Sequence, residues 1–261
     1  MKRDLLFTIL VVALLYLAFC ALMFLMQRSM IYYPRARAVT AAESTMKLPV
    51  DGGGEIVVTV RPHAGPKAII YFGGNAEDVS LNLGEFSAAF PDHALFLMHY
   101  PGYGGSSGSP SEAAIHRDAA ALFRVVHRQH PQVALIGRSL GSGVAARLAS
   151  QAPASRLILV TPFDSLVDVA APVYPFLPVR WLLLDRYESG QVAAGIGIPT
   201  TLIAAEHDEI IPMSSTRKLA ARFGDGVASL TVIRGASHND LDASPDYLRT
   251  MQRALAVPAD G

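Results

Sequence analysis

The stretch VALIGRSLGSGVAARLA, residues 133–149, decides the fold class. It places an apolar run directly before Gly-Arg-Ser-Leu-Gly at residues 137–141, and a helical pattern rich in alanine and leucine follows at once. A serine hydroxyl becomes an effective nucleophile when a sharp turn from strand to helix presents it beside a base, and two glycines permit such a turn. The stretch therefore predicts a buried strand, a nucleophile turn at Ser139 and a helix.

A second interpretation overlaps the first. Residues 141–146, Gly-Ser-Gly-Val-Ala-Ala, match the dinucleotide-binding pattern Gly-x-Gly-x-x-Ala, and Asp164 follows roughly twenty residues later, as that pattern requires. The dinucleotide fold, however, places its glycines at the very end of the strand, whereas residues 137–140 intervene here. The nucleophile turn is the preferred interpretation.

Working outward, apolar runs of five or six residues alternate with longer stretches of helical periodicity. This alternation is typical of βαβ units, so the sequence predicts an α/β fold with a mostly parallel central sheet flanked by helices. The expected buried strands are 68–72, 94–99, 133–136, 157–161, 200–205 and 230–233, and the expected helices are 77–90, 111–130, 140–151, 214–223 and 246–255. Shorter strands are expected at 30–34, 45–48 and 55–61, with a turn at 51–54.

Residues 163–197 interrupt the alternation, because they are rich in proline and contain Trp-Leu-Leu-Leu at 181–184. In a sheet wound in this way, an insertion at this point overhangs the carboxyl ends of the strands, where ligands bind. A small lid or acyl-binding wall is one interpretation, and the ordinary packing of a crossover helix is the other.

The N-terminus holds the most biased composition of the chain. Residues 5–26 contain no charge, and as a helix they would span about 33 Å, close to the roughly 30 Å hydrocarbon layer of a bilayer. A cleaved signal peptide would have a shorter apolar region and then small residues, but MFLMQR follows at 23–28. We therefore expect a single-pass membrane anchor over residues 1–29 and a catalytic domain over 30–261. Basic residues flank both ends of the apolar run, so the side of the membrane stays open.

Composition argues against several functions. Lys plus Arg and Asp plus Glu both number 22, so no basic field would attract nucleic acid. The only cysteine, Cys20, excludes an intrachain disulfide and a cysteine-based zinc site, and no His-x-x-x-His spacing appears, so no metal is expected. The sequence gives no indication of the oligomeric state.

A nucleophilic serine in this fold needs an acid and then a histidine further along the chain. Asp208 comes just after the strand 200–205, beside the competing acids Glu206 and Glu209. Asp208 is preferred because a short loop separates it from the strand and an apolar Ile-Ile-Pro follows it. His238, which follows the strand 230–233 after four intervening residues, is the only histidine downstream of both Ser139 and Asp208.

The seven other histidines have less specific surroundings. His99, at the end of a strand, is a candidate for supporting the site from behind. The remaining six are expected to be solvated because they fall in loops or on polar helix faces: His63, His93, His116, His127, His130 and His207.

Acyl transfer also needs hydrogen-bond donors for the developing oxyanion. One expected donor is the backbone amide of Leu140, the residue after the nucleophile. The other is expected from the loop after the strand 68–72, with the amide of Asn75 preferred and that of Gly74 as the alternative. The same glycines also suit a simple helix cap, and the two roles are compatible.

Five motifs occur in order along the chain: FGGNAED at 72–78, YPGYGGSSG at 100–108, GRSLGSG at 137–143, DEIIP at 208–212 and GASHND at 235–240. Together, over residues 31–255, they resemble the membrane-anchored α/β-hydrolases, a group that includes protein depalmitoylating thioesterases, lysophospholipases and uncharacterised bacterial relatives. Two positions depart from the family pattern. Gly73 stands where a histidine is usual, and His99 stands where an aspartate is common.

The resemblance implies a serine hydrolase that cleaves carboxylic ester or thioester bonds of lipid or acylated substrates without a cofactor. By analogy the loop 100–109 would line the site, with Tyr103 near the substrate entrance. The alternatives are a serine peptidase or amidase, and an anchored protein that retains the fold but only binds.

Overall fold

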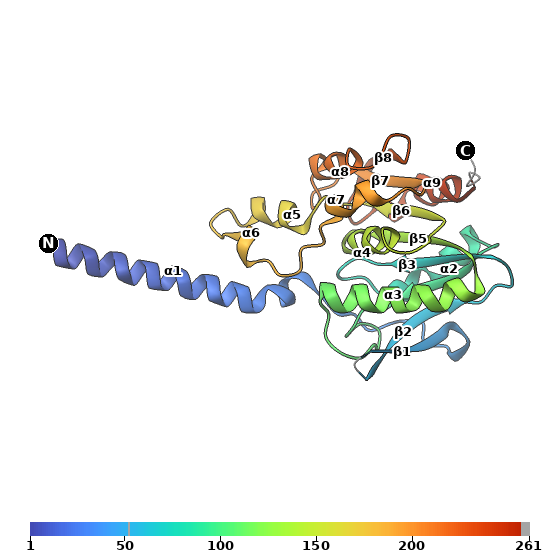
Figure 1. The fold of residues 1–261 in the computed structure, drawn as a ribbon, viewed down its shortest axis with the longest axis horizontal. Coiled ribbons are helices and arrows are strands. Elements are labelled where there is room, and N and C mark those ends of the chain that lie inside the picture. The colour runs from blue at the N-terminus through green and yellow to red at the C-terminus, as the bar shows by residue number, and fades with distance from the viewer. Residues whose placement is uncertain (52, 257–261) are drawn as a thin grey trace.

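The computed structural model describes residues 1–51 and 53–256. Gly52 of the expected turn and the last five residues of the expected catalytic domain lie outside this description. The described residues form one eight-stranded sheet in the order β1-β2-β4-β3-β5-β6-β7-β8 (Figure 1). The strands are β1 (Thr45–Val50), β2 (Gly54–Arg61), β3 (Lys67–Phe72), β4 (Ala94–Met98), β5 (Gln132–Arg138), β6 (Arg156–Val160), β7 (Thr200–His207) and β8 (Ala228–Ser237).

Six of the strands, β3 to β8, run parallel, while β1 and β2 join the edge in antiparallel pairs. This arrangement confirms the predicted α/β fold with a mostly parallel sheet. The register sets Phe72 of β3 beside Gly137 of β5, and Arg138 beside Val160 of β6. The loops that leave β3, β5, β7 and β8 therefore emerge together at the carboxyl ends of the strands, where ligands bind in folds of this kind.

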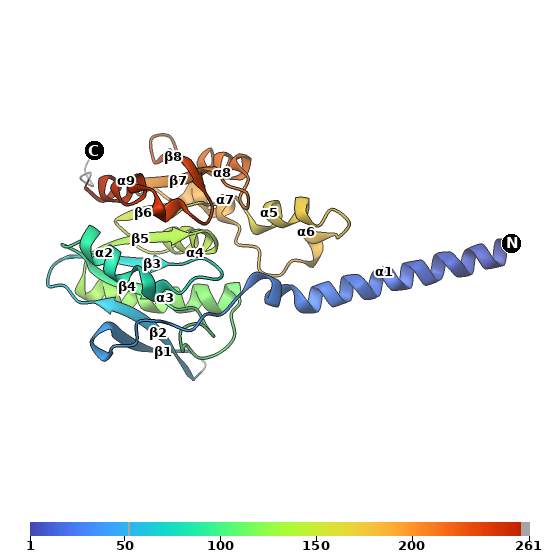
Figure 2. The same ribbon diagram turned by 180° about the vertical axis from the view of Figure 1, so that it is seen from behind.

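Helices cover both faces of the sheet (Figures 1 and 2). One face packs against α3 (Glu112–Gln129), α4 (Leu140–Ala149) and α8 (Met213–Ala220), through side chains that include Leu122, Val144 and Leu219. The other face packs against α2 (Leu83–Ala89) and α9 (Pro245–Ala256), with Phe86 and Met251 in its core. Burial of these apolar faces is the main force that holds the layers together.

The helix α1 (Lys2–Ile31) projects from the end of the domain at which the candidate site lies (Figure 1). Among the described residues it is the one helix long and apolar enough to cross a membrane. The expected strand at 30–34 was wrong, because the helix continues through Met30 and Ile31 and the chain then runs extended without joining the sheet. The helix also extends two residues beyond the expected anchor boundary at residue 29.

The segment 163–197 contains three short helices, α5 (Leu166–Val173), α6 (Val179–Leu182) and α7 (Ser189–Val192), and a 3-10 turn (Ala193–Gly195). The helices α5 and α6 lie beside the C-terminal half of α1, away from the sheet (Figures 1 and 2). The segment is thus not a single crossover helix packed on the sheet.

Two other boundaries differ from the predictions. The helix expected at 77–90 begins as a 3-10 turn (Val79–Asn82), and α2 follows only at Leu83, because Glu77 and Asp78 use their side chains to bind loop amides. The last strand extends to Ser237, which pairs with His207 after an irregularity at the end of β7. This extension brings the chain to His238.

Candidate active site

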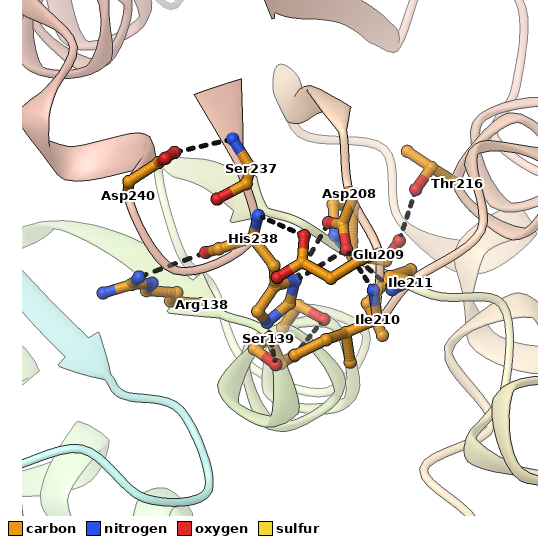
Figure 3. A network of polar contacts seen from close by, with 12 residues as sticks. Arg138, Ser139, Asp208, Glu209, Ile210, Ile211, Thr216, Ser237, His238 and Asp240 are labelled. Carbon is orange, nitrogen blue, oxygen red and sulfur yellow. Dashed lines mark hydrogen bonds and ion pairs between the residues drawn. The ribbon is translucent and has the colours of Figure 1, made fainter. Parts of the chain in front are cut away.

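Three polar side chains follow three strands of the sheet. Ser139 comes directly after β5, Asp208 directly after β7 and His238 directly after β8. All three loops leave the same edge, and the three side chains point toward one another there (Figure 3). Residues separated by as many as 99 positions in the chain are brought together.

Ser139 occupies a strained turn between β5 and α4. Its φ of 51° lies in a region that side chains other than glycine rarely adopt, and such strain is concentrated at functional positions. The turn depends on the two glycines that flank it. A Cβ at Gly137 would collide with the backbone of Gly141, and a Cβ at Gly141 would collide with the carbonyl of Phe72. The glycines are therefore required because no side chain fits at either position of the turn.

A chain of hydrogen bonds joins the three side chains. The Ser139 Oγ lies 3.1 Å from His238 Nε2, and His238 Nδ1 lies 2.9 Å from Asp208 Oδ2. The His238 residue is only 5% exposed, and the Asp208 side chain is equally buried. Shielding from water strengthens hydrogen bonds and the attraction between charges, so the contacts that join these three side chains are stronger than they would be on an exposed surface.

Asp208 is fixed by its own loop. Its Oδ1 accepts hydrogen bonds from the backbone amides of Ile210 and Ile211, at 3.0 and 2.7 Å. The competing acids have other partners, because Glu209 accepts from the His238 amide and Glu206 from the Gly235 amide. Both therefore hold the histidine loop in place, and only Asp208 reaches the imidazole. Sequence reasoning missed this support from the two glutamates.

The loop after β3 passes next to the nucleophile. A Cβ on Gly74 would lie 3.8 Å from the Ser139 Cβ. The Gly74 amide donates to Glu77 Oε2 at 2.7 Å, which removes it as the alternative donor for an oxyanion. In the described part of the chain no protein acceptor takes the amide of Asn75, and Leu140, the first residue of α4, has no acceptor within its helix. These two amides remain as the candidate donors.

Tyr103 does not line the site, contrary to the expectation. It is 2% exposed, and its hydroxyl donates to the carbonyl of Asn75 at 2.6 Å and accepts from the Tyr33 amide at 2.8 Å. None of the residues that line the cavity beside Ser139 comes from the loop 100–109. The loop instead lies behind the candidate oxyanion loop and supports it.

An apolar cavity of about 560 Å³ opens beside Ser139 and His238. This volume is within the range of about 300–1,000 Å³ that is usual for small-molecule sites. The helices α5 and α6 and the turn between them supply much of its wall: Leu166, Val169, Val173, Leu177 and Val179. The C-terminal part of α1 supplies another part of the wall. The cavity is suited to an extended apolar group.

The dinucleotide interpretation was wrong. Residues 141–146 lie inside α4 and not in a loop between strand and helix, so they cannot wrap a pyrophosphate. Gly143 packs against the Tyr187 ring, and the Asp164 carboxylate is 2.8 Å from Lys218 Nζ. Among the described residues no three His, Cys, Asp or Glu side chains are placed to hold a metal ion.

Two expectations for the histidines need comment. His99 is buried against β2, where its Nε2 lies 2.8 Å from Thr59 Oγ1, and desolvation lowers its pKa to about 4. It packs under Gly104 and makes no contact with the three catalytic candidates. His130 was expected to be solvated but is buried, with Nδ1 2.7 Å from the carbonyl of Gly65.

Comparison with known proteins places this geometry in a family. Residues 67–186 match the model of the α/β-hydrolase fold, and an uncharacterised protein of Mycobacterium tuberculosis is 36% identical over 82% of this chain and 81% of its own length. The chain belongs to the α/β-hydrolase fold family.

Other similar proteins carry the family name. The α/β-hydrolase domain-containing protein 17C of Xenopus tropicalis is 28% identical over 62% of this chain and 52% of its own length. Among solved structures, an esterase of Pyrococcus furiosus superposes with a TM-score of 0.70 at 15% identity, covering 86% of this chain and 98% of its own. The enol-lactonase of Burkholderia xenovorans superposes with a TM-score of 0.64 at 15% identity, over 81% of this chain and 100% of its own. At 15% identity these two structures establish only the fold of this α/β-hydrolase.

Proposed function

We propose that the chain is a membrane-anchored serine hydrolase that cleaves carboxylic ester or thioester bonds of lipid or acylated substrates. The proposal is carried by one observation, the continuous hydrogen-bonded chain from Ser139 Oγ through His238 to Asp208. In this proposal residues 1–29 anchor the chain, residues 30–261 hold the catalytic domain, and residues 163–197 cover the site.

The proposed reaction has two steps. As the Ser139 Oγ attacks the acyl carbon, its proton passes to His238 Nε2, and Asp208 stabilises the imidazolium through Nδ1. The amides of Leu140 and Asn75 donate to the oxyanion of the tetrahedral intermediate. When the intermediate collapses, the leaving alcohol or thiol takes the proton from His238. Water then repeats the sequence on the acyl-enzyme and releases a carboxylic acid.

The substrate class is supported by the surroundings of Ser139. The apolar cavity suits a hydrocarbon chain, and α1 would hold the site at a membrane surface, where esters of long acyl chains are found. The names of two solved relatives, an esterase and an enol-lactonase, both describe enzymes that act on ester bonds. These points favour esters over amides.

The test uses the full-length protein in phosphatidylcholine vesicles with p-nitrophenyl esters, S-acyl thioesters and peptide p-nitroanilides. Removal of any triad member leaves only a small residual rate in serine proteases, so Ser139→Ala is expected to lower kcat by about 10⁴-fold or more. Ser150→Ala is the matched control, because Ser150 ends the same helix and, among the described residues, its hydroxyl bonds only the carbonyl of Arg147. Equal rates for the wild type and Ser139→Ala would refute the proposal, and faster cleavage of anilides than of esters would assign a peptidase instead.

A further inference from the structure

The C-terminal part of α1 forms a wall of the cavity beside the nucleophile. Five of its residues line the same cavity as Ser139 and His238: Met23, Phe24, Gln27, Met30 and Ile31. They recur every three or four positions, so they lie on one face of the helix. A helix that served only as a tether would not need to line the cavity that holds the catalytic side chains.

Polar contacts fasten this wall to the end of α6 and the residues that follow it. Gln27, which is 8% exposed, accepts a hydrogen bond from the Leu184 amide at 2.7 Å and donates to the Leu182 carbonyl at 3.2 Å. Arg28 Nε lies 3.0 Å from Asp185 Oδ2, and the Asp185 carboxylate is almost fully buried. A buried amide and a buried carboxylate are costly unless both are paired, so these contacts favour one position of α1 against α6.

The end of α1 also holds the candidate oxyanion loop. The Asn75 side chain donates from Nδ2 to the carbonyl of Ile31 at 2.9 Å, and the Tyr33 amide donates to the carbonyl of Asn75 at 3.0 Å. Tyr103 completes the arrangement by bonding both Tyr33 and Asn75. The direction of the Asn75 backbone amide, the candidate oxyanion donor, is therefore set by the residues at the end of the anchor helix.

The contact between α1 and the α5–α6 segment reaches far along the helix. Tyr16 donates to the carbonyl of Phe176 at 2.9 Å, and the rings of Phe19 and Phe176 are 6.3 Å apart. Tyr16 precedes the first buried polar residue, Gln27, by eleven positions, which is about 16 Å along a helix and close to half of a hydrocarbon layer of about 30 Å. With Gln27 at the membrane surface, Tyr16 and the turn at Phe176 would lie deep among the acyl chains.

The exposed side chains of this segment fit such a location. Val173, Phe176 and Trp181 are 63%, 59% and 87% exposed, although all three are apolar. An exposed apolar patch that continues the surface of a membrane helix indicates contact with lipid. Trp181 lies next to Leu182, which bonds Gln27, so it falls near the interface, where tryptophan is enriched in membrane proteins.

We propose that the acyl site is built partly from the anchor: the last three turns of α1 form one wall and fix the Asn75 amide, and with α5 and α6 they open the cavity into the hydrocarbon layer. An acyl chain then enters sideways from the bilayer without passing through water. This inference rests on the proposed acyl hydrolase activity and adds that α1 determines which length of acyl chain the enzyme prefers.

The first test fills the cavity from the α1 side in full-length protein reconstituted in phosphatidylcholine vesicles. Met23→Trp places a larger side chain in the cavity, whereas Leu25→Trp makes a comparable change on the opposite, exposed face of the same helix. The readout is the ratio of kcat/KM for p-nitrophenyl dodecanoate to that for p-nitrophenyl acetate. We expect Met23→Trp to lower this ratio at least tenfold and Leu25→Trp to leave it within twofold of the wild type.

The outcomes separate the two proposals. If wild-type hydrolysis depends on Ser139 but both tryptophan variants keep the wild-type ratio, the wall formed by α1 is refuted while the hydrolase stands. If Ser139→Ala retains the full rate on both esters, the proposed function itself fails, and the inference fails with it.

The second test measures depth by fluorescence, because Trp181 is the only tryptophan of the chain. Brominated phosphatidylcholines are expected to quench Trp181 best when the bromines lie near the carbonyl end of the acyl chain. Phe176→Trp, made together with Trp181→Phe, is expected to be quenched best by bromines farther down the chain. Strong quenching by aqueous iodide, with none by brominated lipid, would overturn the membrane-embedded location.

Discussion

Replacement of Asn75 by alanine separates two ways in which this residue can stabilise an oxyanion. In the proposed mechanism the backbone amide is the donor, and the side chain only fixes the loop through its 2.9 Å bond to the carbonyl of Ile31. Alanine keeps the amide and removes that bond. The carbonyl of Asn75 keeps its bonds from Tyr33 and Tyr103, so Asn75 loses one of the three hydrogen bonds that tie it to Ile31, Tyr33 and Tyr103.

The magnitude follows from the one bond that is lost. A typical hydrogen bond contributes about 0.5–1.5 kcal/mol net, and about 1.36 kcal/mol corresponds to tenfold in rate. If the whole loss appears in the transition state, kcat falls by about 2- to 13-fold. Loss of an oxyanion donor itself would lower kcat by about 10²–10³-fold.

The assay is steady-state hydrolysis of a p-nitrophenyl ester by the reconstituted full-length protein, with the fold of each variant checked by circular dichroism. A decrease of a hundredfold or more would refute the reasoning, because it would make the side-chain amide the donor. An unchanged kcat would refute it in the other direction, since the contact with Ile31 would then position nothing that matters to catalysis.

Two further predictions concern stability. Gly141→Ala forces a Cβ into the carbonyl of Phe72 and should destabilise the fold by about 1–3 kcal/mol or more. Gly84→Ala places its Cβ with nothing within 4 Å and should stabilise α2 by about 0.5–1 kcal/mol. Thermal unfolding of both variants measures the two effects. A rise or no change in Tm for Gly141→Ala would contradict the packing of the nucleophile turn. Burial lowers the pKa of His99 from 6.5 to about 4, so as the pH falls His99 takes up a proton in the unfolded chain before it does so in the folded protein. The contribution of His99 to the free energy of unfolding is therefore fully present above about pH 6.5, and it decreases by up to roughly 3 kcal/mol as the pH falls toward 4. His99→Gln should flatten this acid-side decrease without abolishing it, because the pKa of His93 is also lowered to about 4; an identical pH profile would contradict the neutral, buried His99.

The sheet was readable from the sequence because its signals are local. Each buried parallel strand is a short apolar run bounded by polar residues, and the predicted cores of β3, β4, β5, β6 and β7 all lie within or beside the observed strands. Ser139, Asp208 and His238 were predicted from equally local signals, because Ser139 directly follows an expected strand and Asp208 and His238 each follow one after a short loop. The structure brings these three side chains within hydrogen-bonding distance.

What the sequence could not provide depends on contacts between distant residues. The run 30–34 contains isoleucine and two tyrosines, a composition that favours a strand, but Met30 and Ile31 instead continue the helix against the cavity. Tyr103 was placed at the entrance by resemblance alone, and only the folded loop shows it bonded to Asn75. The association of Gln27 with Leu182, 155 positions away, leaves no periodic signal in either segment.

The proposed activity depends most directly on the chemical identity of the nucleophile. Reconstituted full-length protein treated with an alkyl fluorophosphonate, digested and analysed by tandem mass spectrometry should carry the phosphonyl group on Ser139. The rate of labelling should fall at least a hundredfold in His238→Ala, because the hydroxyl loses its proton acceptor. An adduct on another residue, or ester hydrolysis that continues with Ser139 unmodified, would contradict the account.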